Sequence, residues 1–361
     1  MPSEPPEVPR LRRTPAPPTV RAYSPGRVNL IGDHTDYNEG LALPMAVDLG
    51  TTVTIAVQRG SRLVLSSDAE PAKADVDVYS RFDELLLRSV EPHWARYVAA
   101  VAALVRPLRG GQGHVETTLP IGAGLSSSAS LEVALALALG LDEDPLTTAT
   151  LCQRAEQAAT GVPSGLMDQL VVCAAKEGCA SLIDFSDCSV RQLRLPEGAE
   201  VVVVHSGQPR TLDSSPYAAR RAECEAAAYG MGPLGHLSER DLVGISDPLL
   251  RRRARHVVSE CDRVRQFCSA LVSDDLAEAG ALMNASHRSL AVDFDVSTAA
   301  LDALVEHLSS LRGVFGARLT GAGFGGCAVA LTEPGALDLD AFGTPAWRVR
   351  PCYGARLLPP G

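Results

Sequence analysis

The sequence predicts an α+β fold of two lobes, with mixed sheets and helices and an active site in the cleft between the lobes. Strand-like segments rich in β-branched residues alternate with helical segments at first, and helices dominate from about residue 211. A glycine-rich turn and an apolar strand follow near the end. With 361 residues the chain can bury cores for two lobes. We expect a flexible Pro-rich arm over residues 1–18, an N-terminal lobe over 19–200 and a C-terminal lobe over 201–361.

The elements of the first lobe follow from local patterns. Residues 41–58 and 62–67 run or alternate apolar as strands do, after a turn at residues 38–40. Residues 91–108 have helical spacing and lead through a Gly-rich stretch to a strand at 114–119. This order predicts a sheet in which a helix connects the earlier strands to the strand at 114–119.

The same reasoning gives the remaining elements of the first lobe and the main strands of the second. Residues 126–140 predict a long apolar helix, and residues 147–161 predict another that ends at Gly161. Strands are expected at residues 179–185 and 199–207. The stretch "ARLTGAGFGGCAVAL", residues 317–331, predicts a Gly-rich turn followed by an apolar strand.

Composition limits the classes of function. A formal net charge of −10 argues against a nucleic-acid partner, since such binding needs a basic face. The basic stretch "RRRARH", residues 251–256, is interpreted as a solvated helix face. No apolar run reaches the roughly 18 residues of a membrane helix, and the Pro-rich start lacks the apolar core of a secretion signal. We therefore expect a cytoplasmic protein with no membrane partner, acting as a monomer.

Nine cysteines are scattered without C-x-x-C pairs. This spacing favours reduced thiols that fill the core over a disulfide or zinc framework.

Charged residues are dense in the stretch "GRVNLIGDHTDYNEG", residues 26–40. It holds Arg27, Asp33, His34 and Asp36 among residues that suit a buried turn. Burying such groups is costly unless they are paired or hold a ligand. The stretch therefore predicts a bound polar molecule.

A second stretch, "LPIGAGLSSSASLEVALALALG" over residues 119–140, suits phosphate. Its glycines let the backbone approach a ligand, its serines offer hydroxyls, and a helix with free N–H groups follows at once. A Gly-Ser turn that only caps a core helix is the alternative. The two lysines, Lys73 and Lys176, both lie outside Gly-rich loops, so the Walker loop and the protein-kinase lysine arrangement are absent.

These motifs carry a family resemblance. The pattern from Pro120 to Ala129 resembles the ATP loop of the superfamily that includes galactokinase, homoserine kinase, mevalonate kinase and phosphomevalonate kinase. "GRVNLIGDHTDYN" resembles the galactokinase signature, and "GVPSGLMDQ" and "LTGAGFGGC" follow in that family's order. Nearly the whole chain after residue 19 is covered, and four motifs in order are highly specific. The resemblance implies an enzyme that phosphorylates the anomeric hydroxyl of galactose with ATP and Mg²⁺.

The resemblance also implies roles for named residues. Asp168 would accept the proton of the sugar hydroxyl or only orient it, and Arg27 would assist by charge. Ser128 and Glu156 would bind magnesium. The expected ATP contacts are Gly122, Ala123, Gly124, Leu125, Ser126, Ser127, Ser128 and Ala129. The expected sugar contacts are Asp33, His34, Asp36, Gly165 and Tyr217.

Structural interpretations stand beside these roles. Asp168 could cap the next helix, Arg27 could form an ion pair with Asp36, and Glu156 could be an exposed helix residue. The glycines at 321, 323, 325 and 326 would close on the phosphates, although a tight strand turn explains them nearly as well.

Three positions depart from the family pattern. Asp33, Ser164 and Pro216 stand where galactokinases usually have Glu, Cys and Glu. These departures bear on the sugar more than on the reaction, so an aminosugar or a pentose is the alternative substrate. A sugar- and ATP-binding sensor without turnover is the alternative outside enzymes, and a kinase of the mevalonate or homoserine type is a more remote one.

Overall fold

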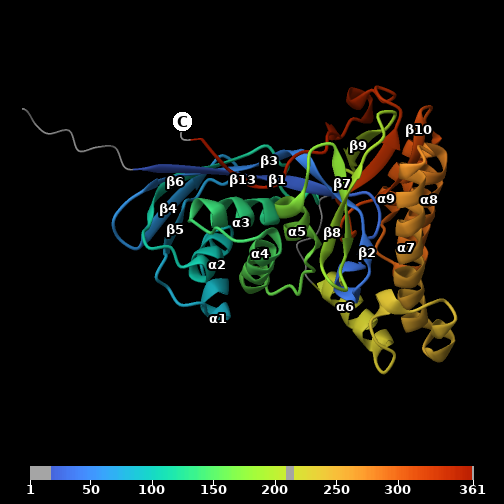
Figure 1. The fold of residues 1–361 in the computed structure, drawn as a ribbon, viewed down its shortest axis with the longest axis horizontal. Helices are drawn as coiled ribbons and strands as arrows, with labels where there is room; N and C mark the ends of the chain where they lie inside the picture. Colours follow the sequence, from blue (N-terminus) through green and yellow to red (C-terminus); the bar gives the residue numbers. More distant parts are fainter. Residues whose placement is uncertain (1–17, 209–214, 360–361) are drawn as a thin grey trace, which may run out of the picture.

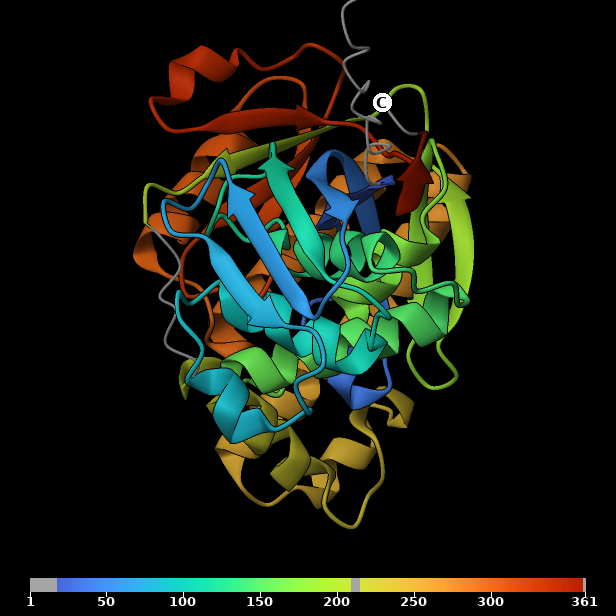
Figure 2. The ribbon, with the colours of Figure 1, turned by 90° about the vertical axis from the view of Figure 1, so that its left-hand side faces the viewer.

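The computed structural model describes residues 18–208 and 215–359. Its largest sheet has six strands in the order β13-β1-β3-β6-β4-β5 (Figures 1 and 2). The expected arm at 1–18 lies almost wholly outside the described residues. The strands are β1 (Thr19–Asn29), β3 (Pro44–Val57), β4 (Arg62–Ser67), β5 (Ala74–Asp77), β6 (Gly111–Thr117) and β13 (Arg356–Leu358).

Helices of the first lobe cover one face of this sheet, as Figure 1 shows. Helix α3 packs against β1 and β3 on one side and against α2, α4 and α5 on the others. It is therefore apolar on nearly all sides, with small Ala side chains that allow close packing. The helices are α1 (Glu84–Arg88), α2 (Ala95–Val105), α3 (Ser127–Ala138), α4 (Pro145–Thr160) and α5 (Met167–Ala174).

A four-stranded sheet in the order β10-β11-β9-β12 forms the second lobe, with α8 and α9 packed on β10. A three-stranded sheet, β2-β7-β8, lies beside the lobe boundary. The strands are β2 (Leu41–Ala42), β7 (Cys179–Asp184), β8 (Ser189–Arg194), β9 (Glu200–His205), β10 (Val314–Leu319), β11 (Cys327–Thr332) and β12 (Ala346–Val349). The helices are α6 (Ser215–Ala228), α7 (Pro248–Val272), α8 (Leu276–Ser289), the π-helix Leu290–Phe294 and α9 (Ala299–Ser310).

One apolar cluster joins the lobes. It contains Val28 and Leu43 from the first lobe and Val203, Phe267 and Met283 from the second, all fully buried. Strand β13 pairs with β1, so the end of the chain returns to the first sheet. The lobes are therefore packed against each other through buried apolar side chains.

The expected α+β class is confirmed, and most expected elements are present. Gly161 ends α4 in the left-handed conformation, with φ of 75°. None of the nine cysteines forms a disulfide, and five of them are buried. Among the described residues, no helix combines the length and apolar character needed to cross a membrane.

The interpretation of residues 251–256 as a solvated face is wrong for three of them, since Arg253, Ala254 and His256 are buried. Arg253 and His256 are 2% and 0% exposed on α7. Arg253 Nε lies 2.6 Å from a carboxylate oxygen of Glu223 on α6, and His256 lies 2.9 Å from the Ser289 hydroxyl. Partners from neighbouring elements make burial of these polar groups tolerable.

Candidate active site

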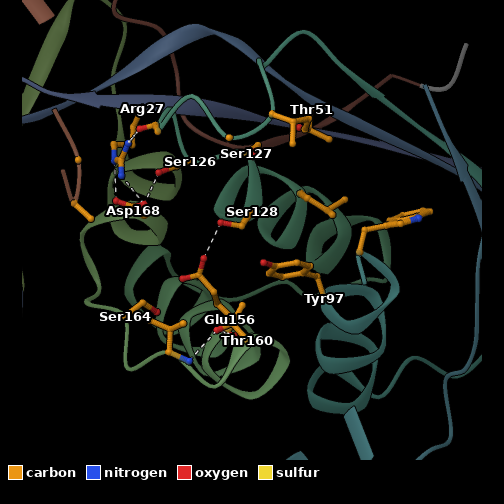
Figure 3. Close-up of a pocket in the computed structure, with 18 of the residues that line it drawn as sticks. Arg27, Thr51, Tyr97, Ser126, Ser127, Ser128, Glu156, Thr160, Ser164 and Asp168 are labelled. Carbon is orange, nitrogen blue, oxygen red and sulfur yellow. Dashed lines mark hydrogen bonds and ion pairs between the residues drawn. The ribbon is translucent and has the colours of Figure 1, made fainter. Parts of the chain in front are cut away.

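A cavity of about 600 Å³ lies between the lobes. Most of its wall comes from the first lobe, and Tyr217, Gly321 and Ala322 close it from the second. Figure 3 shows part of this wall, with Arg27 and Asp168 at one end and Thr51 and Tyr97 at the other. Its size suits a small-molecule site.

An Arg–Asp pair forms one end of the cavity. Arg27 Nε and Nη2 donate to the two carboxylate oxygens of Asp168, at 2.7 and 2.6 Å. The Ser126 hydroxyl also donates to Asp168. The side chain of Asp168 is 26% exposed and that of Arg27 only 5%, so the carboxylate is the more accessible group. The ion pair that we considered for Arg27 with Asp36 is formed with Asp168 instead.

Two oxygen groups proposed for a cation meet at the centre of the cavity. The Ser128 hydroxyl donates to Glu156 at 2.7 Å, across the gap between α3 and α4 (Figure 3). Gln169 Nε2 lies 3.0 Å from Glu156 and 3.1 Å from Glu132, a fully buried residue whose pKa burial raises well above its usual value. Glu156 is therefore held by hydrogen bonds from Ser128 and Gln169 rather than exposed on its helix.

The loop expected to bind phosphate, residues 119–126, is called the phosphate loop below and precedes α3 as expected. Ser126, with φ of 60°, turns the chain into the helix, so that the first free N–H groups of α3 lie beside the serine hydroxyls. Five of the eight expected ATP residues line the cavity: Gly122, Gly124, Ser126, Ser127 and Ser128. Ala123, Leu125 and Ala129 bury their side chains in the core, so only their backbone is available to a ligand.

The glycine turn after β10 lies against this loop. A Cβ on Gly321 would be 3.6 Å from the carbonyl oxygen of Gly124, and one on Gly326 would be 3.5 Å from that of Ala123. Both residues have positive φ, of 79° and 86°, which favours glycine. An added Cβ would make only ordinary van der Waals contact at either position, so the backbone conformation is what favours glycine there.

All five expected sugar contacts line the same cavity: Asp33, His34, Asp36, Gly165 and Tyr217. Asp36 packs directly on the Gly165 backbone, since a Cβ there would overlap the Asp36 carboxylate. His34 Nδ1 lies 2.9 Å from the Tyr37 hydroxyl, and the His34 ring lies 4.5 Å from that of Phe294. Phe294 ends the π-helix, a rare irregularity that is frequent at functional sites.

Sequence reasoning missed the other half of the cavity. Apolar and polar side chains from β3, β4, β6, α2 and the start of α3 line it. They occur singly along the chain and form no motif, so the only available signal was their place on predicted elements. The main members are Thr51, Ser67, Glu70, His93, Trp94, Tyr97, Thr117, Ile121 and Leu131.

The serine loop, the Arg27–Asp168 pair and the cavity between the lobes together indicate a class of enzyme. A Gly-Ser loop at a helix N-terminus faces an Arg–Asp pair and a cluster of carboxylate, imidazole and phenol side chains, an arrangement that suits phosphoryl transfer to a small molecule. Family models of the GHMP kinases match this reading, the N-terminal domain over residues 96–176 and the C-terminal domain over 267–340. The protein is a small-molecule kinase of this superfamily.

The galactose-binding signature of galactokinases matches residues 12–57. Galactokinase from Roseiflexus sp. is 41% identical, covering 89% of this chain and 85% of the relative, and that from Bos taurus is 42% identical, covering 89% and 86%. The structure of Lactococcus lactis galactokinase complexed with galactose superposes with a TM-score of 0.84 at 31% identity, covering 94% of this chain and 95% of that one. The chain belongs to the galactokinase family.

Proposed function

We propose that this chain transfers the γ-phosphoryl group of ATP to the anomeric hydroxyl of D-galactose, giving galactose 1-phosphate and ADP. One observation carries the proposal. The Arg27–Asp168 pair lies between the sugar-signature residues and the serine loop, within a single cavity. In a chain of the galactokinase family, this arrangement places an acceptor hydroxyl and a phosphate on the two sides of one carboxylate.

The sugar is assigned to the end of the cavity that holds Asp36 and His34. Isolated sugars need a partner for each buried hydroxyl, because an unmade hydrogen bond is costly. Carboxylates at 33 and 36, the imidazole of His34 and the Tyr217 hydroxyl supply these partners, and the missing side chain at Gly165 leaves room for the Asp36 carboxylate.

Asp168 is assigned the acceptor hydroxyl. Because Arg27 and Ser126 already donate to its two oxygens, the carboxylate is held in one orientation. Phosphoryl transfer proceeds through a loose transition state, so the nucleophile needs positioning more than strong activation. We therefore propose that Asp168 orients the hydroxyl and takes its proton as the bond to phosphorus forms, while Arg27 stabilises the developing charge.

ATP is assigned to the remaining half. Its phosphates would lie along the serine loop and its base between α2, β6 and Leu131, near Tyr97. Ser128 and Glu156 are hard oxygen donors, and one or two protein ligands are what Mg²⁺ takes when phosphates and waters complete its shell. When bound there, the ion neutralises phosphate charge. Among the described residues there is no cluster of three or more acids, histidines or cysteines placed to hold a metal ion.

We further propose a monomer in the cytoplasm. Every residue assigned to sugar, phosphate and metal comes from the same chain. Nine free cysteines suit a reducing compartment.

Asp36 gives this function a pH dependence. Burial first, and repulsion by Asp168 next, raise the pKa of Asp36 from 3.8 to about 6. As the pH falls through about 6, the carboxylate is therefore protonated and loses acceptor capacity for a sugar hydroxyl. We expect kcat/KM for galactose to fall on the acid side with an apparent pKa near 6, measured between pH 5 and 8 at saturating ATP. A kcat/KM that stays flat to pH 5 would contradict this assignment.

A substrate panel tests the sugar. ADP release is measured with MgATP and galactose, galactosamine, N-acetylgalactosamine, glucose, arabinose or galacturonate. We expect clear preference for galactose. Galacturonate should be rejected, because the Asp33 and Asp36 carboxylates repel the carboxylate of that sugar. Preference for arabinose or galactosamine would instead make Asp33 the residue that sets a different specificity, and no ADP release with any sugar would favour a sensor.

A further inference from the structure

Asp33 differs from the other sugar-facing groups in its partners. It is 1% exposed, and both of its carboxylate oxygens are already engaged by the second lobe. Arg318 on β10 forms an ion pair with one oxygen, and the Gly321 N–H donates to the other at 3.2 Å. A carboxylate has about four acceptor positions, so Asp33 can hold these two groups and still accept a sugar hydroxyl.

Arg318 is the cation that belongs to Asp33. It is fully buried and does not line the cavity. Burial raises the pKa of Asp33 and Arg318 is the strongest influence that opposes it. Arg27, also nearby, is committed to Asp168. Without Arg318 the buried Asp33 carboxylate would have no dedicated cation.

The surroundings of Arg318 fix it in place. Its Nη1 lies 3.4 Å from the Asn29 carbonyl oxygen, and its Nη2 lies 3.9 Å from Glu260 on α7. Glu260 in turn accepts the Gly32 N–H at 3.0 Å and pairs with Arg263 at 2.7 Å. These contacts therefore hold residues 29–33 at several points on the side away from the cavity.

The same contacts tie the sugar segment to the glycine turn. His34 Nε2 lies 3.2 Å from the Ala322 carbonyl oxygen, and the Asn29 N–H donates to the Thr320 hydroxyl at 3.1 Å. Arg318 begins this contact zone and Ala322 ends it, and Gly321 between them lies near the Gly124 carbonyl oxygen. Residues 29–34, which face the proposed sugar site, are thus held by buried contacts with residues 318–322, which include the turn next to the phosphate loop.

We propose that Arg318 is a positioning residue for sugar recognition, which acts through its buried ion pair with Asp33 although it never touches the sugar. The inference rests on the proposed function and adds a specificity element outside the cavity wall. It follows that loss of Arg318 weakens sugar binding far more than ATP binding.

The test compares Arg318→Met, Arg318→Lys, Asp33→Asn and the Asp33→Asn/Arg318→Met double variant. We expect Arg318→Met to raise KM for galactose at least tenfold, about 1.4 kcal/mol, with KM for ATP changed less than about threefold. Arg318→Lys keeps the charge but loses the planar fork, so it should recover part of the affinity. In the double variant, KM should be no higher than in the worse single variant, because both changes break one interaction.

The matched control is Arg348→Met, since Arg348 lies on β12 at the opposite edge of the same sheet and pairs with Glu200 at 3.2 Å. It should leave KM for galactose unchanged. Galactose-induced thermal stabilisation, measured without ATP, reports sugar binding independently of turnover.

Lower thermal stability of Arg318→Met or Arg318→Lys with an unchanged KM for galactose would overturn the proposal. If Arg318→Met does not fold, the KM for galactose of Arg318→Lys alone decides whether the proposal stands. All KM values are measured with the sugar that the wild-type chain phosphorylates fastest. If that sugar is not galactose, the proposed function is overturned, but the role of Arg318 is still tested.

Discussion

Asp168→Asn is expected to lower kcat for galactose phosphorylation by about a thousandfold or more, with KM for galactose changed only a few-fold. The amide cannot take the hydroxyl proton. It also presents an NH₂ group where Asp168 now accepts from Arg27 or Ser126, so the orientation of Arg27 is lost with the base. Steady-state kinetics with MgATP measures the loss, and thermal shift with galactose shows that the sugar still binds.

Asp144→Asn provides the matched control. Asp144 caps the start of α4 by accepting the N–H groups of Leu146 and Thr147, and asparagine caps helices about as well. This change should leave kcat and stability nearly as they are. Near-wild-type kcat in Asp168→Asn would remove the carboxylate from the chemical step.

Arg27→Lys is expected to lower kcat about a hundredfold, the usual effect of removing one positioned donor from a developing charge. Lysine keeps the positive charge but cannot donate along two parallel directions to Asp168. It also loses the bond from Arg27 Nη1 to the Gly124 carbonyl oxygen, at 2.5 Å, which fixes the phosphate loop. KM for ATP should therefore rise along with the fall in kcat.

Arg21→Lys is the control for this change, because Arg21 lies on the same strand and does not line the cavity. Wild-type turnover in Arg27→Lys would show that a point charge suffices and that the paired geometry has no catalytic role.

Sequence reasoning succeeded where the signal is local. The approximate extents of α3 and α4 follow from apolar spacing, and the end of α4 follows from Gly161, although α4 begins at Pro145, before the expected residue 147. The phosphate loop was readable for the same reason, since its glycines, serines and helix are contiguous. These features depend on backbone conformation and helix capping, which neighbouring residues determine.

Long-range pairing was readable only through the family resemblance. Arg27 and Asp168 are 141 residues apart, and only the order of the motifs indicated that they meet. Arg318 was missed although it stands inside a quoted motif, because nothing local shows that its side chain turns toward Asp33. On α7, the buried face that includes Arg253, His256 and Glu260 follows the helical period, but the charges hid that pattern.

The central claim is that this cavity directs phosphate to carbon 1 of galactose. The most direct measurement is NMR of the product formed from galactose and MgATP by the wild-type chain. We expect a single sugar phosphate whose anomeric proton is split by coupling to phosphorus, together with one ADP for each phosphate transferred. Phosphate on any other carbon, or ADP formed without a sugar phosphate, would contradict it.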